Sequence, residues 1–319
     1  MKRIEDVLDS SIHTIGIAGH INPDGDCIGS TTGLYLYITE NYPEYQVDLY
    51  LEEPKPLLQT MTAYDKSIHE VNEPRAYDLF ITCDTSEKPR IALAGGLFEQ
   101  ANKTVCIDHH VSNPGFAQVN HIVADASSCA EVLADLMDPV RISVNTATNL
   151  YTGIVHDTGV FQYTNTTPHT MEVAAGLMRK GVRHSQIIDR TFNIRSYDQN
   201  RILGYALEKS EQRLGGRLVV SSLTIREMNR YGVTLKDLDC IVSQLRLTEG
   251  AEGAVFAYEK EPGIFKISLR SNTYLDVAKA AAEFGGGGHV HAAGCTLKGE
   301  ANEVLRKVVD VLEDYMEEP

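Results

Sequence analysis

The first half of the chain alternates short apolar runs with longer segments in which apolar residues recur at a helical spacing. Short apolar runs bounded by turn residues are typical of buried parallel strands. The predicted strands span 15–19, 46–51, 79–83 and 105–107. The predicted helices span 27–40, 127–137 and 145–156. Such alternation implies right-handed crossovers and therefore a doubly wound, mostly parallel α/β sheet.

The pattern changes in the second half of the chain. The stretch 170–207 is polar and helical in pattern, and we interpret it as the connection between two domains. The strand-like runs beyond it span 218–223, 253–258 and 264–270, and helical segments at 234–247 and 275–284 separate them. This order predicts a smaller mixed-sheet α/β domain. We therefore expect a first domain at 1–190 and a second at 205–319.

Composition narrows the class of protein. A length of 319 residues is typical of two domains, and the hydrophobic fraction of 43% is ordinary for a globular protein. No apolar run approaches the roughly 18 residues that cross a bilayer, and the charged N-terminus is unlike a secretory signal. The six cysteines show no Cys-x-x-Cys spacing, which indicates buried residues in a reducing compartment. We expect a cytoplasmic protein without a membrane partner.

The formal net charge of −15 bears on the choice of substrate. Proteins that hold long nucleic acids usually present a basic surface, because much of their affinity comes from phosphate contacts. The chain has no such stripe of basic residues. A phosphate ester substrate should therefore be small or short, and long nucleic acid is not an expected partner.

Acidic and histidine residues gather at four places, and three of these places directly follow predicted strands. The four motifs are Gly-His20-Ile-Asn-Pro-Asp24-Gly-Asp26, Thr-Cys-Asp84-Thr, Asp108-His109-His110 and Val-His-Asp157-Thr-Gly. In open α/β sheets, ligands bind at the carboxyl ends of the strands. Carboxylates and imidazoles that converge there would repel one another or stay protonated unless cations lay among them. The sequence therefore predicts a metal-centred catalytic site.

Asp24 and Asp26 also have a simpler interpretation, because Pro-Asp-Gly-Asp is good turn chemistry and both residues could merely close Asx turns. The similar settings of Asp84, His109 and Asp157 favour the metal interpretation. Oxygen and imidazole donors without a thiolate pattern favour Mn²⁺ or Mg²⁺ over a structural zinc. Six donors suit two cations about 3.5–4 Å apart that share one carboxylate, an arrangement that activates water and offsets charge on a phosphate.

A second motif, Gly-Gly-Gly-Gly-His289-Val-His291-Ala-Ala-Gly, spans 285–294 and follows a predicted helix. Consecutive glycines let backbone N–H groups approach an anion closely, although a glycine run is also the ordinary composition of a flexible loop. The histidines that follow at once favour the anion-binding interpretation. Arg270, at the end of a predicted strand, could make a bidentate phosphate contact or an ordinary surface salt bridge.

Together, the four acidic and histidine motifs resemble those of the DHH phosphoesterase superfamily, which is named for the tripeptide found here at 108–110. The resemblance covers nearly the whole chain. It implies two metal ions per site, commonly Mn²⁺, with Mg²⁺ or Co²⁺ as substitutes. The implied ligands are His20 and Asp24 for one ion, Asp26, His109 and Asp157 for the other, and Asp84 as the bridge.

The same resemblance implies that Asp84, Asp108 and His110 are catalytic. His110 would face the substrate phosphate and stabilise developing charge. Asp108 would orient the imidazoles, because metal-bound histidines generally need such a partner.

The C-terminal motifs resemble the DHH-associated C-terminal domain of the oligoribonuclease branch of this superfamily. The implied substrate-binding residues are Arg270, Ser271, Gly286, Gly287, Gly288, His289 and His291. They would hold a nucleotide in the cleft between the two domains, where the active site is expected. Family II inorganic pyrophosphatases carry a different, lysine-bearing C-terminal domain, and RecJ-like exonucleases are much longer.

The resemblance implies two reactions: hydrolysis of RNA only a few nucleotides long to 5′-mononucleotides, and removal of the 3′-phosphate from 3′-phosphoadenosine-5′-phosphate (pAp). Two alternatives stay open. The same machinery could act on cyclic di-AMP or on linear pApA, or the chain could be a non-catalytic nucleotide sensor. A sensor should have a damaged ligand set, whereas all six candidates are present. The resemblance also allows a homodimer.

Overall fold

The computed structural model describes residues 1–54, 58–72, 75–91 and 93–316, apart from the side chain of His289. The chain forms two compact units, Met1–Ile194 and Arg195–Pro319, and each is described by itself. No helix among the described residues is long and apolar enough to span a membrane.

The first unit is built on a six-stranded sheet in which every strand pair is parallel. Its strands are β1 (Thr14–Ala18), β2 (Gln46–Tyr50), β3 (Ser67–Ile68), β4 (Leu79–Cys83), β5 (Lys103–Asp108) and β6 (Val119–Ile122). Their order in the sheet is β3-β2-β1-β4-β5-β6. The predicted parallel α/β fold is therefore confirmed. The short edge strands β3 and β6 were not predicted, because they are only partly buried and lack a continuous apolar run.

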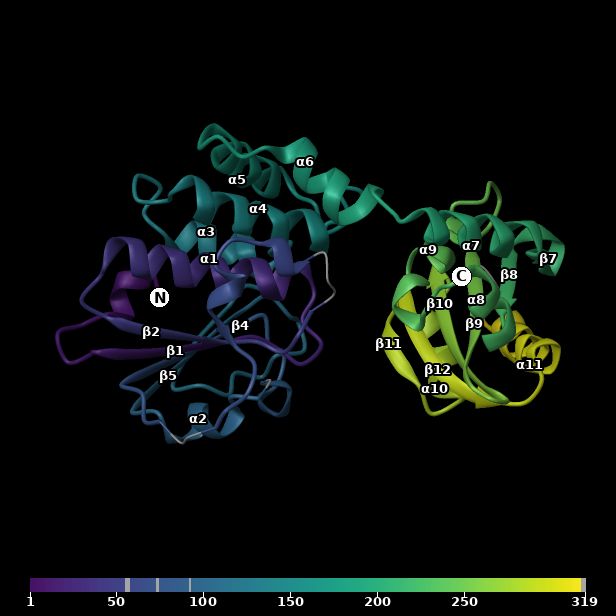
Figure 1. Ribbon diagram of the computed structural model, residues 1–319, viewed down its shortest axis with the longest axis horizontal. Coiled ribbons are helices and arrows are strands. Elements are labelled where there is room, and N and C mark those ends of the chain that lie inside the picture. Colours follow the sequence, from purple (N-terminus) through teal and green to yellow (C-terminus); the bar gives the residue numbers. More distant parts are fainter. Residues whose placement is uncertain (55–57, 73–74, 92, 317–319) are drawn as a thin grey trace. The chain divides into compact units, whose positions relative to one another are not determined.

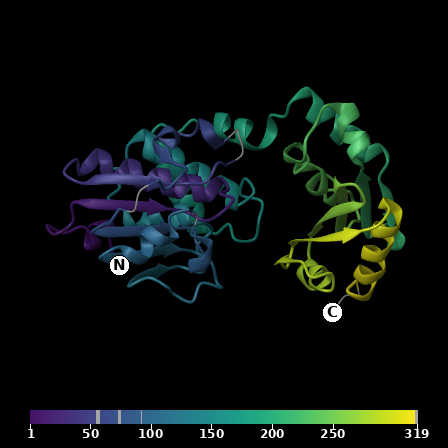
Figure 2. The ribbon, with the colours of Figure 1, turned by 60° about the horizontal axis from the view of Figure 1, so that its bottom comes forward.

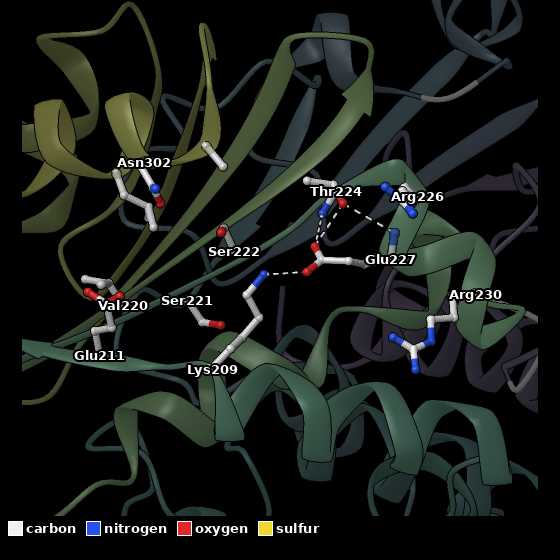
Figure 3. A pocket seen from close by; sticks show the side chains of 12 residues that line it. Lys209, Glu211, Val220, Ser221, Ser222, Thr224, Arg226, Glu227, Arg230 and Asn302 are labelled. Atoms are coloured by element: carbon white, nitrogen blue, oxygen red, sulfur yellow. Dashed lines mark hydrogen bonds and ion pairs between the residues drawn. The ribbon is translucent and has the colours of Figure 1, made fainter.

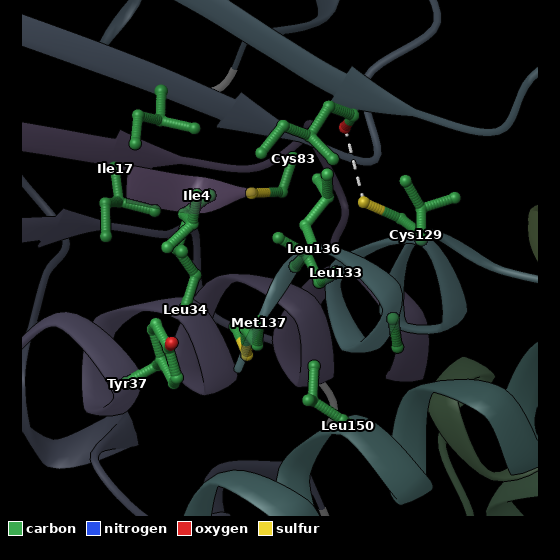
Figure 4. Close-up of a cluster of buried hydrophobic side chains, with 14 of the residues drawn as sticks. Ile4, Ile17, Leu34, Tyr37, Cys83, Cys129, Leu133, Leu136, Met137 and Leu150 are labelled. Atoms are coloured by element: carbon green, nitrogen blue, oxygen red, sulfur yellow. Dashed lines mark hydrogen bonds between the residues drawn. The ribbon is translucent and has the colours of Figure 1, made fainter. Parts of the chain in front are cut away.

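Helices cover both faces of this sheet (Figure 1). The helices of this unit are α1 (Gly25–Asn41), α2 (Gly95–Gln100), α3 (Cys129–Leu136), α4 (Val144–Asp157), α5 (Pro168–Arg179) and α6 (His184–Ile188). The main core lies between the sheet and the helices α1 and α3 and continues between α1 and α4; Ile17 of β1, Leu34 of α1 and Leu133 of α3 are fully buried in it (Figure 4). The opposite face carries Phe80 of β4 and packs against α2 through Phe98.

Helix α1 is almost wholly buried, because α4 covers the side that faces away from the sheet. The close approach of the two helices depends on glycine. A Cβ atom on Gly29 would lie 2.6 Å from the Asn149 carbonyl oxygen and 2.8 Å from the Gly153 nitrogen. The helix begins two residues before the predicted start, because Asp24 caps it by accepting hydrogen bonds from the backbone N–H groups of Asp26 and Cys27.

The second unit contains a six-stranded mixed sheet. Its strands are β7 (Glu211–Arg213), β8 (Leu218–Leu223), β9 (Gly253–Glu261), β10 (Ile264–Ser271), β11 (Gly287–His289) and β12 (Ala292–Lys298). Their order is β11-β12-β10-β9-β8-β7. The pair β8–β9 is parallel and the other pairs are antiparallel, as a mixed sheet requires.

Alternate residues of the central strands face two separate cores, as a sheet covered on both sides demands. The helices are α7 (Tyr197–Glu208), α8 (Ile225–Tyr231), α9 (Cys240–Arg246), α10 (Val277–Ala282) and α11 (Ala301–Asp314). Leu218 and Val220 pack with α10 and α11, whereas Val219 and Leu223 pack with α7, α8 and α9. Figure 2 shows α11, in yellow, alongside this sheet.

For this unit one prediction was wrong in detail and one helix was missed. The helix expected at 234–247 is a 3-10 turn, Leu235–Asp237, followed by the short α9. Helix α8 was not predicted, although Thr224 and Glu227 form a capping box at its start and Gly232, with φ of +68°, ends it. Capping residues explain α8 better than apolar spacing does, because the helix makes only two turns.

The glycine-rich run is part of a β-hairpin, β11–β12, and not a flexible loop. Two of its glycines are required by close packing inside the hairpin. A Cβ atom on Gly286 would lie 2.3 Å from the Gly294 oxygen, and one on Gly288 would lie 2.4 Å from the Ala292 oxygen. Gly288 also has a φ of +149°, which disfavours other residues.

The packing of α1 on α4 gives a testable prediction. Gly29→Ala should lower the free energy of unfolding by about 1–3 kcal/mol, because the added methyl group meets backbone atoms that cannot move aside. Gly176→Ala in α5 is the matched control, because a Cβ there meets nothing within 4 Å; it should raise stability by up to about 1 kcal/mol. Urea unfolding followed by circular dichroism would compare them. Equal stability of the two variants would contradict the proposed close approach.

Candidate metal centre

Three neighbouring strands of the first sheet end in the predicted metal-binding motifs. Strands β1, β4 and β5 are adjacent and parallel, so their carboxyl ends lie at one edge. His20 follows β1, Asp84 follows β4, and the 108–110 tripeptide begins at the last residue of β5. The start of α1 adds Asp24 and Asp26 to the same edge, and the last residue of α4 adds Asp157.

Asp84 lies at the centre of this arrangement. Its side chain is 3% exposed, with Oδ2 at 3.4 Å from His20 Nε2 and Oδ1 at 3.5 Å from His109 Nε2. The two carboxylate oxygens therefore face two different imidazoles. The φ of Asp84 is +54°, a left-handed conformation that is uncommon outside glycine and that aspartate and asparagine tolerate better than most residues. Such strain often occurs at functional sites.

Each imidazole has further carboxylates nearby. His109 Nε2 lies 3.1 Å from Asp157 Oδ2 and 3.9 Å from Asp26 Oδ2. On the other side of Asp84, His20 Nε2 lies 3.8 Å from Asp24 Oδ1. The structure thus brings together all six candidate ligands in two sets that meet at Asp84.

The donor atoms are close enough to bind cations. In the described part of the chain, three groups have one ligand atom per residue within 4.8 Å of one another. They are His20, Cys27 and Asp84; Asp84, His109 and His110; and Asp26, His109 and Asp157. Asp24 is absent from them, and its Oδ1 atom caps α1. Asp24 therefore also closes an Asx turn, because its Oδ1 atom accepts hydrogen bonds from the N–H groups of Asp26 and Cys27.

Cys27 is a poor candidate ligand despite its position. Burial raises the pKa of its thiol to about 12, so the thiolate that metals prefer is disfavoured. All six cysteines of the chain are free, and all except Cys240 are buried. These observations agree with the interpretation of the cysteines as small core residues.

Electrostatics explains why this cluster favours cations. Burial and the charges of Asp84 and Asp157 raise the pKa of Asp26 well above its usual range. Burial and the charge of Asp84 also raise the pKa of Asp157, which lies at the C-terminal end of α4, where the helix dipole disfavours negative charge. Burial would lower the pKa of His109, but hydrogen bonds to Asp157 and Asp84 raise it to about 12. A divalent cation would balance the same carboxylates with two charges, and the oxygen and imidazole donors suit it.

Two carboxylates are held rigidly by hydrogen bonds. Asp26, fully buried, accepts hydrogen bonds from the N–H groups of Cys129 (2.7 Å) and Ala130 (3.0 Å) at the start of α3. Asp108, also fully buried, lies 2.7 Å from His110 Nδ1 and accepts a hydrogen bond of 2.6 Å from the Asn113 amide.

His110 is therefore oriented by Asp108, and its Nε2 atom is left for other partners. Its Nδ1 atom also lies 3.7 Å from Asp84 Oδ1. Burial would lower the pKa of His110, but the hydrogen bond to Asp108 raises it. A raised pKa favours the protonated imidazole, which can stabilise negative charge on a phosphate.

Sequence reasoning missed Asn113 and did not predict the contact that His156 makes near the site. Asn113 joins Asp108 to the Thr85 carbonyl oxygen, but a single asparagine in a turn gives no sequence signal. The ring of His156 packs so closely on Gly25 that a Cβ atom there would lie 2.0 Å from its Cγ atom. Gly25 within the Asp-Gly-Asp turn is therefore required by packing.

The substrate-binding candidates lie on the second unit, at the end of β10 and along the β11–β12 hairpin. Ser271 Oγ lies 2.8 Å from His291 Nδ1, and the Ser271 N–H donates to the His291 carbonyl oxygen. Arg270 pairs with Ala292 in the sheet and donates from Nη1 to the Leu269 carbonyl oxygen. The structure therefore groups Arg270, Ser271 and His291. The predicted role of His289 concerns a side chain outside the described part of the structure.

Two family models match most of the chain. The model of the DHH family N-terminal domain matches residues 14–154, and the model of the DHHA1 domain matches residues 195–318. A protein from Thermus thermophilus named bifunctional oligoribonuclease and PAP phosphatase NrnA is 30% identical, over 99% of this chain and 94% of its own length. The Bacillus subtilis protein of the same name is 25% identical, over 95% and 96%.

A solved structure shows the same fold. It is an exopolyphosphatase-related protein from Bacteroides fragilis, with a TM-score of 0.87, 24% identity and coverage of 95% of this chain and 93% of that one. The family models match both halves of the chain, and the Thermus thermophilus relative spans nearly all of it. The chain therefore belongs to the DHH family of phosphoesterases.

Proposed function

We propose that this protein hydrolyses short RNA oligonucleotides to 5′-mononucleotides and removes the 3′-phosphate from pAp. The observation that carries the proposal is the position of Asp84, whose two oxygens each face a separate set of imidazole and carboxylate donors. The names of the relatives, oligoribonuclease and PAP phosphatase, supply the substrate class.

Metal binding is part of the proposal. His20 and Asp24 would hold one cation, Asp26, His109 and Asp157 the second, and Asp84 both. We favour Mn²⁺, with Mg²⁺ or Co²⁺ as substitutes, because the donors are oxygen and imidazole. Two cations in such a site polarise the phosphate, activate water and offset charge on the leaving oxygen.

The chain's own residues would then position the reaction. His110, oriented by Asp108, would stabilise negative charge on the substrate phosphate. The hydrogen bonds to Asp26 and Asp108 fix these groups before substrate binds, so little reorganisation is needed during the reaction.

Substrate binding is assigned to the second unit. We propose that Arg270 binds a substrate phosphate and that Ser271 and His291 contact the nucleotide, together with backbone groups of Gly286, Gly287 and Gly288 and the side chain of His289. The short substrate agrees with the net charge of −15, which would repel a long polyanion. Free cysteines agree with action in the reducing cytoplasm.

Asp84→Asn tests the metal centre. Asparagine tolerates the left-handed conformation at this position, so the fold should persist while one charged bridging oxygen is lost. Turnover of short RNA and of pAp should fall at least about a hundredfold, with fewer metal ions bound per chain by elemental analysis. Asp125→Asn, an exposed change outside the site, is the control. Near-normal turnover with Mn²⁺ in Asp84→Asn would refute the shared-carboxylate scheme.

A substrate panel tests the proposed reactions. With Mn²⁺, and separately with Mg²⁺ and Co²⁺, the protein would be given RNA of three to five nucleotides, long RNA, pAp, cyclic di-AMP, pApA and pyrophosphate. We expect mononucleotides from the short RNA and phosphate from pAp, while the long RNA is spared. If cyclic di-AMP, pApA or pyrophosphate were the only good substrate, the substrate assignment would be wrong. Binding of pAp without phosphate release would indicate a sensor.

Arg270→Ala tests the assignment of the second unit. Loss of a charge-assisted phosphate contact should lower kcat/KM for short RNA about tenfold or more, mainly through KM, with the metal content unchanged. Lys266→Ala is the matched control, because this exposed cation lies on the same face of β10, four residues away. Loss of metal from Arg270→Ala, or an equal effect of Lys266→Ala, would mean that Arg270 has another role.

A further inference from the structure

A cavity of about 870 Å³ lies entirely within the second unit, and none of the residues assigned above lines it (Figure 3). Its walls come from the end of α7, the strands β7 and β8, the helix α8 and the first turns of α11. Most of the lining residues are polar or charged, and three of them carry cationic side chains, Lys209, Arg226 and Arg230.

The cavity exists because β7 is shorter than its neighbour. Strand β7 pairs only with Leu218, Val219 and Val220 of β8. Ser221 and Ser222 continue β8 beyond the start of β7, and both line the cavity. The hollow is therefore a feature of the sheet edge.

The carboxylates of the cavity are already paired. Glu227 accepts hydrogen bonds from Lys209 (2.7 Å) and Tyr205 (2.6 Å) and from both the N–H and the hydroxyl group of Thr224. Burial would raise its pKa, but these hydrogen bonds lower it to about 2. Glu211 forms an ion pair with Arg213. Neither carboxylate therefore neutralises the two arginines.

Arg226 and Arg230 lie four residues apart on α8, so they occupy one side of this helix (Figure 3). Both are exposed, and within the described residues neither forms an ion pair. The Arg230 guanidinium makes only a distant contact with the Tyr231 ring, 6.0 Å from its centroid.

We infer that this cavity, which shares no residue with the metal centre, is a second binding site for a small phosphate-bearing ligand. Arg226 and Arg230 would hold the phosphate, because guanidinium groups match its oxygens with two parallel hydrogen bonds each. The Asn302 amide, from the first turn of α11, lies in the same lining and offers a further donor. The lining has no aromatic side chain on which a base could stack, so the phosphate is the recognised group.

Titration calorimetry on the full chain in EDTA, with AMP, inorganic phosphate and adenosine as separate ligands, tests this inference. AMP should bind, and adenosine should not. Equal binding of phosphate and AMP would identify phosphate alone as the ligand, whereas tighter binding of AMP would show a contribution from the nucleoside. The Arg226→Ala/Arg230→Ala variant should weaken AMP binding at least about tenfold.

The control variant, Lys260→Ala/Lys266→Ala, removes the same charge from exposed positions of this unit outside the cavity and should bind AMP as the unaltered protein does. Asn302→Asp keeps the side-chain size but adds a negative charge to the lining, so it should also weaken binding. Unchanged AMP binding in Arg226→Ala/Arg230→Ala, or binding of adenosine as tight as that of AMP, would overturn the inference. The test needs no turnover, and the comparison with Arg226→Ala/Arg230→Ala separates binding in this cavity from nucleotide binding at Arg270.

Discussion

Buried negative charge at the carboxyl edge of the first sheet is the constraint on which the rest of this structure depends. Asp26, Asp84 and Asp157 converge where little water can solvate them, and burial together with the charge of Asp84 raises the pKa of Asp26 and of Asp157. Such an arrangement is costly unless positive charge lies among the carboxylates. The hydrogen bonds to Asp26 from the start of α3, and the imidazoles on either side of Asp84, are the protein's own compensation. These groups do not balance all of the negative charge of the carboxylates, and the charge that remains is the physical reason to propose divalent cations.

Much of this edge could be predicted from sequence, because short apolar runs ending in acidic or histidine residues have few interpretations. Parallel strands bring those ends together whatever their order. The order itself was not predictable: β1 is adjacent to β4 as well as to β2, and this adjacency places His20 beside Asp84. Residues such as Asn113 were missed because their role arises only from tertiary contacts, and β3 and β6 were missed because edge strands need no apolar run.

The role of the glycine-rich segment could not be predicted from its composition. Four consecutive glycines predicted an anion-binding loop, but Gly286 and Gly288 are required by close backbone packing in the β11–β12 hairpin. Glycines needed for packing give no evidence for a ligand by themselves. The case for substrate binding in this unit therefore depends on Arg270 and on the Ser271–His291 pair, whose side chains provide charged and hydrogen-bonding groups.

The metal centre and the helix packing are physically coupled. Gly153 of α4 lies against α1, and a Cβ atom there would come within 2.6 Å of Asp26 Oδ1 and 2.7 Å of the Ala130 Cβ atom. Asp157 follows Gly153 by about one helical turn. The close contact that buries α1 therefore also fixes the separation of Asp26 from Asp157, two carboxylates from distant parts of the sequence. Because a packed helix interface has little freedom to adjust, the two ligands are held in place by the core itself, and a change in helix packing would alter the donor geometry.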